Sequence, residues 1–127
     1  MPVRNRRLVA LVALGLLAVV AAGCSRENHP PASKAFCTAA DDYNTELERA
    51  ARKRTASVER QLPLVEEIAR TAPKGIVKDA NTFLDAMRRR AAGDLSVVDD
   101  PKVRTAVDNV TRYANQACNV YKRDSGI

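Results

Sequence analysis

The sequence is poor in the residues from which most catalytic and metal sites are built. Its 127 residues include one histidine, three cysteines and no tryptophan. The single histidine, His29, cannot form a usual zinc site or a Ser-His-Asp triad, and no two cysteines have CxxC spacing. A glycine-rich phosphate loop is also missing. We therefore expect no enzyme activity, no metal and no cofactor.

Aromatic residues and strand patterns are scarce as well. A surface that stacks nucleic-acid bases needs several aromatic residues among basic ones, so we expect no nucleic-acid partner. The few aromatics could line an apolar pocket, but their helical spacing favours a plain core position for Phe36, Tyr43, Phe83 and Tyr113. No stretch alternates as a strand does, and no hairpin dipeptide occurs between such stretches. The chain is therefore predicted to be all-α.

The one long apolar run lies near the start of the chain. Arginines at positions 4, 6 and 7 precede an apolar run over residues 8–22, and small residues lead from that run to Cys24. As a helix, the run would reach about 22 Å, short of a hydrocarbon core about 30 Å thick. This pattern predicts a secretory signal peptide over residues 1–23.

The end of this segment resembles the lipobox of bacterial lipoproteins. The residues are Val20, Ala21, Ala22 and Gly23, followed by Cys24. In that family the cysteine receives a diacylglyceryl group and becomes the first mature residue. The resemblance implies that Cys24 anchors the protein at the extracytoplasmic face of the cell membrane. Ala21 departs from the family, which most often has leucine there, so an ordinary signal peptide and a secreted protein remain the alternative.

Removing residues 1–23 leaves 104 residues, enough for one domain with a modest core. The removed segment holds three of the 21 basic residues and none of the 15 acidic ones, so the formal charge falls from +6 to +3. Much of the basic character therefore belongs to the signal segment. Residues 24–34 are polar and contain Pro30-Pro31, which predicts an extended tether before a helical domain over residues 35–124.

Two cysteines remain after Cys24 is assigned to the lipid. In an oxidising compartment, a pair such as Cys37 and Cys118 is usually a disulfide. The loop that they close is long, and the chain-entropy model gives about 4–5 kcal/mol of stabilisation. A redox or metal pair is the alternative, but it lacks CxxC spacing and a neighbouring histidine.

Apolar residues recur every three or four positions in four segments, which predicts four helices. The expected ranges are 35–54, 58–71 (or 62–71), 73–91, and 101 to about 121, where Tyr121 ends the apolar stripe. Pro63 and Pro73 are each predicted to lie in a first helical turn. Gly93 is expected to end the third helix, residues 94–100 to form a loop, and Asp100-Pro101 to start the last helix.

Four helices with short links predict an up-down-up-down bundle closed by one disulfide. In that topology the start of the first helix and the end of the fourth lie at the same pole, so Cys37 and Cys118 can meet. Three long helices with a short, kinked second one is the alternative.

The same topology would gather basic residues at the opposite pole, where the first and third helices end. This possible binding surface comprises Arg49, Arg52, Arg54, Arg88, Arg89 and Arg90. It could bind an anionic wall polymer, lipid headgroups or an acidic envelope protein; a solvated surface with cations near helix C-termini is the alternative. The spacing of Asp94, Asp99 and Asp100 does not match a calcium loop and favours helix capping.

The mature part is similar to small helical lipoproteins of actinobacteria, through Phe36-Cys37, Ala72-Pro73 and the segment 113–118. Those proteins have no known activity, so the resemblance adds little about function. Our first functional hypothesis is a lipid-anchored, non-catalytic module that binds an envelope protein or wall polymer. The alternative is a carrier that holds a small apolar or lipid ligand between its helices.

Overall fold

The computed structural model describes residues 31–120. The expected signal peptide, the lipidation site Cys24 and most of the tether lie outside the described residues. Tyr121 and the rest of the expected domain, up to residue 124, also lie outside them.

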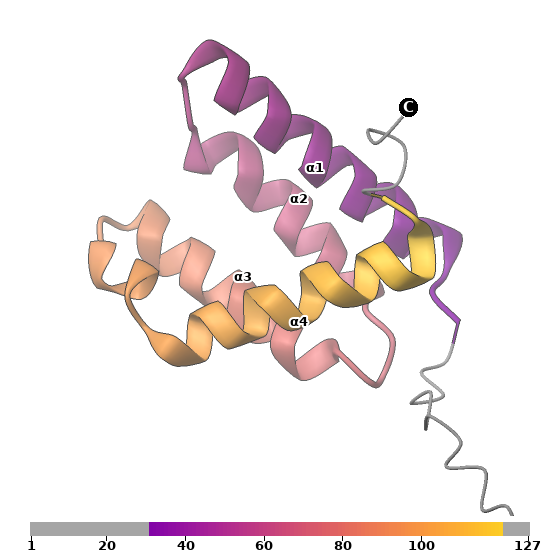
Figure 1. Ribbon diagram of the computed structural model, residues 1–127. Helices are drawn as coiled ribbons and strands as arrows, with labels where there is room; N and C mark the ends of the chain where they lie inside the picture. The colour runs from indigo at the N-terminus through magenta and orange to yellow at the C-terminus, as the bar shows by residue number, and fades with distance from the viewer. Residues whose placement is uncertain (1–30, 121–127) are drawn as a thin grey trace, which may run out of the picture.

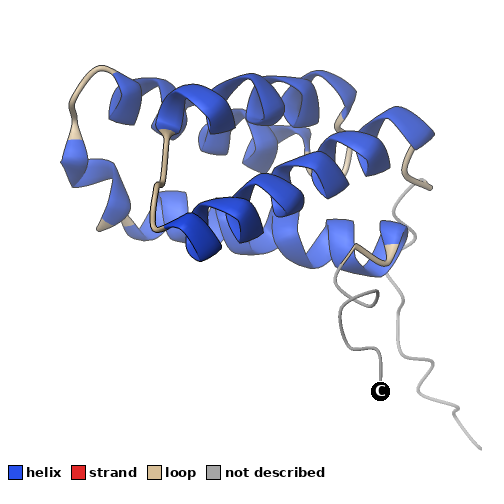
Figure 2. Cartoon of the chain, turned by 90° about the horizontal axis from the view of Figure 1, so that it is seen from above, coloured by secondary structure: helices blue, strands red, loops and turns tan. Residues whose placement is uncertain are grey.

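The described chain is an all-helical bundle of four α-helices with no strand among residues 31–120 (Figure 2). The helices are α1 (Lys34–Lys53), α2 (Val58–Thr71), α3 (Val77–Ala91) and α4 (Pro101–Cys118), with a short 3-10 helix, η1 (Leu95–Val98), before α4. Successive helices run in alternating directions (Figure 1). The predicted fold class is confirmed, and α2, with 14 residues, is nearly as long as α3, with 15.

Helix α1 begins and ends at capping residues. The Ser33 hydroxyl oxygen accepts a hydrogen bond from the Phe36 backbone N–H at 3.1 Å, which satisfies one of the free donors of the first turn. Arg54 ends the helix in the left-handed conformation, with φ 51°. The ordered chain therefore starts slightly before residue 35, and Ala32 already packs against the core.

The two proline predictions for α2 and α3 are wrong. Pro63 lies inside α2, which starts at Val58, and its side chain is exposed. Pro73 precedes α3: its carbonyl accepts from the N–H groups of Ile76 and Val77, both at 3.0 Å, in a separate turn. The burial of Val65 and Ile68 explains why α2 continues through Pro63, because packing outweighs the local cost of that proline. Ile76, buried just before α3, lies in the turn that Pro73 starts.

Helix α3 ends where predicted, at a glycine. Gly93 has φ +95°, which side chains strongly disfavour, and its N–H donates to the Arg90 carbonyl. The Asp94 N–H donates to the Arg89 carbonyl, which completes a Schellman motif. The expected loop then contains η1, whose first turn is capped by Asp94 through the Ser96 N–H at 3.0 Å.

Helix α4 starts as the sequence predicts. The Asp100 carboxylate accepts from the Lys102 N–H at 2.9 Å, and Pro101 occupies the first helical position. The helix ends at Cys118, where Asn119 turns the chain in the left-handed conformation. The predicted capping roles of Asp94 and Asp100 are confirmed, whereas Asp99 ends η1 through its backbone N–H.

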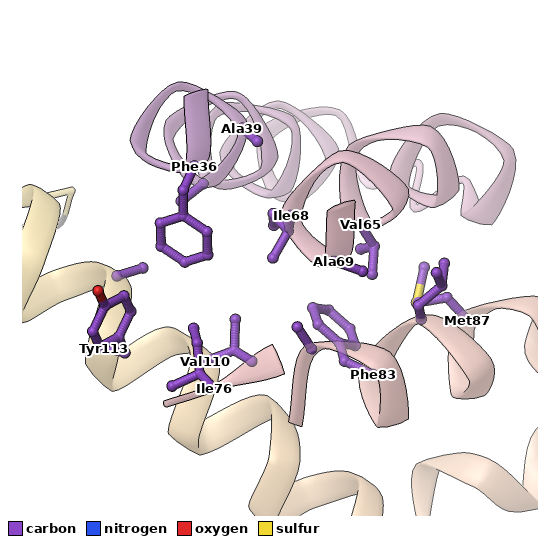
Figure 3. Close-up of a cluster of buried hydrophobic side chains, with 14 of the residues drawn as sticks. Phe36, Ala39, Val65, Ile68, Ala69, Ile76, Phe83, Met87, Val110 and Tyr113 are labelled. Atoms are coloured by element: carbon purple, nitrogen blue, oxygen red, sulfur yellow. The ribbon is translucent and has the colours of Figure 1, made fainter. Parts of the chain in front are cut away.

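Apolar side chains from all four helices meet in one core, as Figure 3 shows. Phe36, Val65 and Ile68 are its largest fully buried side chains. Burial of each contributes about 1.5–3 kcal/mol. The rings of Phe36 and Tyr113 meet edge to face at 5.5 Å, and burial raises the pKa of the Tyr113 phenol.

The predicted disulfide is present. The sulfurs of Cys37 and Cys118 are bonded, and their Cα atoms are 5.3 Å apart. It joins the first turn of α1 to the end of α4. Away from this bridge α1 and α4 diverge (Figure 1), and they touch less than any two α-helices that are consecutive in sequence. None of the helices within residues 31–120 is both long and apolar enough to cross a bilayer.

Candidate functional site

An apolar cleft lies where α1 and α4 diverge. Its volume is about 400 Å³, within the range of small-molecule sites. Residues of α1, α2, α3, η1 and α4 contribute to its walls, which expose much more apolar than polar area. The main apolar side chains are Leu47, Phe83, Met87, Val97, Val103 and Val107.

The divergence of the two helices explains why this region is not filled. Leu47 lies on the apolar stripe of α1, yet 36% of it is exposed, because α4 is not close enough to cover it. Tyr43 and Phe83 meet edge to face at 5.6 Å, and both side chains line the cleft.

Helix η1 supplies another wall of the cleft. Val97 is 2% exposed, whereas the neighbouring Val98 is 51% exposed, and both line the cleft. The position of η1 is fixed by Asp94, whose carboxylate accepts from the Ser96 N–H and from Arg89. The Ser96 hydroxyl also donates to this carboxylate. The hydroxyl, as the largest contributor, together with Arg89 and the Ser96 N–H, holds the pKa of Asp94 below its ordinary value.

A few polar side chains interrupt the apolar lining. Gln61 of α2 is 5% exposed, and Arg90, Arg104 and Asp108 also line the cleft. Among residues 31–120, the Gln61 side chain makes no hydrogen bond. Arg90 has no carboxylate partner in the same range. The cleft thus combines an apolar body with polar groups that can orient a ligand.

The structure distributes the six predicted basic residues among different environments. Four of them pair with carboxylates: Arg49 with Glu46, Arg52 with Glu48, Arg88 with Glu66, and Arg89 with Asp94. The Arg49 guanidinium lowers the pKa of Glu46 through its hydrogen bond. Arg54 is the exposed C-cap of α1, and Arg90 lines the cleft. Of the six arginines, only Arg54 and Arg90 therefore have no carboxylate partner among residues 31–120.

Sequence reasoning missed the cleft and its polar residues. It predicted that Phe36, Tyr43, Phe83 and Tyr113 were core residues. Phe36, Phe83 and Tyr113 are buried, but Tyr43 is only partly buried, and both Tyr43 and Phe83 also line the cleft. One signal for the missed site was available: Gln61 lies four residues before Val65, on the same face of α2 as the apolar stripe.

No group of three or more His, Cys, Asp or Glu side chains within the described range is arranged to hold a metal ion. In comparisons with known proteins, no family model, no curated protein and no solved structure matches this chain.

Proposed function

We propose that this protein is a membrane-tethered binding protein that takes an apolar molecule, such as a lipid, into the cleft between α1 and α4. One observation carries the proposal: a cleft of about 400 Å³ with mainly apolar walls in a small bundle. Burying the apolar part of a ligand there releases water from both surfaces. Each buried methylene contributes about 0.8 kcal/mol, so a chain of moderate length supplies micromolar affinity.

The scaffold supports a preformed site. The disulfide and the buried Phe36–Tyr113 pair hold α1 and α4 together at one pole, while η1 holds its place through Asp94. A ligand that enters a preformed cleft loses less binding energy to ordering of the protein. A ligand therefore does not have to separate α1 and α4 in order to bind.

The anchor supports a lipid-derived ligand. Diacylation of Cys24, as the lipobox resemblance implies, would hold the domain at the outer face of the cell membrane, because two acyl chains bind stably where one does not. The cleft would then work within reach of a lipid source. The test is Cys24→Ser in the native host. We expect the native protein to carry the mass of a diacylglyceryl group that the variant lacks, and a native protein without that mass would contradict the anchor.

The binding test uses the Cys24→Ser protein without residues 1–23, which keeps the rest of the mature chain, and dodecanol as a neutral probe in calorimetry. Val107→Trp places a large side chain in the cleft, and Val77→Trp places the same one at an exposed position outside it. We expect Val107→Trp to weaken dodecanol binding about tenfold or more, and Val77→Trp to leave it unchanged. Equal affinity in both variants, or no binding to the unsubstituted protein, would overturn the proposal.

A folding defect in Val107→Trp would leave that comparison ambiguous, so Val98→Trp serves as a second blocking variant. Val98 is 51% exposed at the edge of the cleft, where a larger side chain displaces no core atoms. Far-ultraviolet circular dichroism and the thermal midpoint check the fold of each variant. Weakened binding in Val98→Trp at an unchanged midpoint assigns the loss to the cleft.

A second candidate function is an interaction module that binds another envelope protein. The observation in its favour is the exposure of Leu95, at 68%, and of Val98 on η1, beside the arginines of α3. Single exposed apolar residues are common, so this surface carries less weight than the cleft. Crosslinking in cells tests it: one reproducible partner that is lost in Leu95→Ser supports the module, and no such partner contradicts it.

A further inference from the structure

The Gln61 side chain, which lines the cleft without a hydrogen-bond partner among residues 31–120, indicates that the cleft binds a polar group as well as an apolar one. Gln61 is 5% exposed and lines a cleft with mainly apolar walls. Its side chain makes no hydrogen bond with any residue among 31–120. Gln61 is not among the residues with a fully enclosed, unpartnered side-chain atom, so its amide is accessible from the cleft and free to bind a polar ligand group. A ligand group within the cleft would supply that partner.

Arg90 provides the charge. The three consecutive arginines of α3 point in different directions, since each residue advances a helix by about 100°. Arg88 pairs with Glu66 of α2 and Arg89 with Asp94 of the following loop, whereas Arg90 lines the cleft and has no described carboxylate partner. A half-buried guanidinium without a partner is suited to bind an anion.

The other charged side chains of the cleft limit the charge of the ligand. Arg104 and Asp108 also line it, one helical turn apart on α4. Together with Arg90 they give a net charge of +1. A head with one negative charge balances this set, while a doubly charged phosphate monoester exceeds it. A carboxylate accepts two hydrogen bonds from arginine in a bidentate geometry and can accept one from the Gln61 amide.

Resting on the function proposed above, we infer that the cleft selects an amphiphile with a carboxylate head, of the fatty-acid class. The Gln61 amide and the Arg90 guanidinium bind the head. The acyl chain lies against the apolar side chains of Phe83, Met87 and Val107. A neutral or cationic head on the same chain leaves Arg90 without its anion.

Three ligands with the same chain test this inference: dodecanoate, dodecanol and dodecyltrimethylammonium, each titrated calorimetrically below its micellar concentration into the Cys24→Ser protein. We expect dodecanoate to bind about tenfold more tightly than dodecanol, and the cation to bind most weakly. If no ligand binds, the proposed function fails. If dodecanol binds as tightly as dodecanoate, only the selectivity for a carboxylate fails.

Two arginine variants form a matched pair. Arg90→Gln and Arg88→Gln remove the same charge from neighbouring positions of α3, but only the first side chain lines the cleft. We expect Arg90→Gln to abolish the preference for dodecanoate over dodecanol and Arg88→Gln to retain it. A preference that survives Arg90→Gln, or that falls equally in both variants, would overturn the assignment.

Gln61→Leu removes the hydrogen-bonding amide but keeps a side chain of similar size. Leucine keeps the apolar contacts but cannot donate to a carboxylate, so we expect dodecanoate to bind about fivefold more weakly and dodecanol at least as tightly as before. The thermal midpoint without ligand checks that the variant is folded. Unchanged dodecanoate affinity would exclude Gln61 from head recognition.

Discussion

Cys37 and Cys118 are 81 residues apart in the sequence, yet their Cα atoms lie 5.3 Å apart in the bundle. The bond between them connects the first turn of α1 to the last of α4, the two helices that diverge around the cleft. It therefore closes most of the described chain into one loop. This position gives the disulfide an effect both on stability and on the shape of the cleft.

Replacing both cysteines tests that role. We expect Cys37→Ala with Cys118→Ala to lower the free energy of unfolding by about 2–4 kcal/mol, since the unfolded chain regains the entropy of a long loop. The midpoint of urea unfolding, followed by circular dichroism, measures the change. The unsubstituted protein in reducing agent is the control, and it should approach the midpoint of the double variant. A midpoint that neither change lowers would contradict the structural role.

The proline inside α2 predicts a stabilising substitution. Pro63 has no N–H to donate within the helix, and its side chain is exposed, so replacing it removes little packing. We expect Pro63→Ala to raise the free energy of unfolding by about 2 kcal/mol. Pro101→Ala is the control, because Pro101 occupies the first position of α4, where a missing N–H has no cost. Similar effects at both positions would count against the helical placement of Pro63.

The hydrogen bonds around Asp94 predict a dependence on pH. Ser96 and Arg89 lower the pKa of this carboxyl from its ordinary value of 3.8. Its contribution to stability is therefore complete above 3.8 and is lost as the pH falls through the lowered pKa. In thermal unfolding between pH 6 and pH 2, Asp94→Asn should start less stable and lose less on acidification. The control Asp99→Asn, from the same loop, should lose stability on acidification as steeply as the unsubstituted protein does.

The fold could be predicted because its determinants are local or covalent. The helical stripes, the Asp100-Pro101 start of α4, the stop at Gly93 and the Cys37–Cys118 pair each follow from residue chemistry at fixed spacing. The error at Pro63 has the opposite cause. There, tertiary burial of Val65 and Ile68 outweighs what the proline prefers locally, and sequence spacing does not measure that burial.

The candidate site could not be predicted because it depends on how two helices diverge. Whether Leu47 is covered depends on its distance from α4, which no pattern in either helix specifies. The same holds for the arginines of α3, since the partners of Arg88 and Arg89 lie on other elements. Only Gln61, a polar residue on an apolar stripe, indicated the cleft from within the sequence.

Met87 gives the most direct test of ligand binding in the cleft. It lines the cleft, is 5% exposed, and is the only methionine in the sequence apart from Met1, which belongs to the expected signal peptide. Methyl-labelled methionine in the Cys24→Ser protein without residues 1–23 should therefore give one resonance. At saturating dodecanoate we predict that this resonance shifts and shows nuclear Overhauser contacts to the acyl chain. A Met87 resonance that neither shifts nor contacts the chain would contradict binding in the cleft.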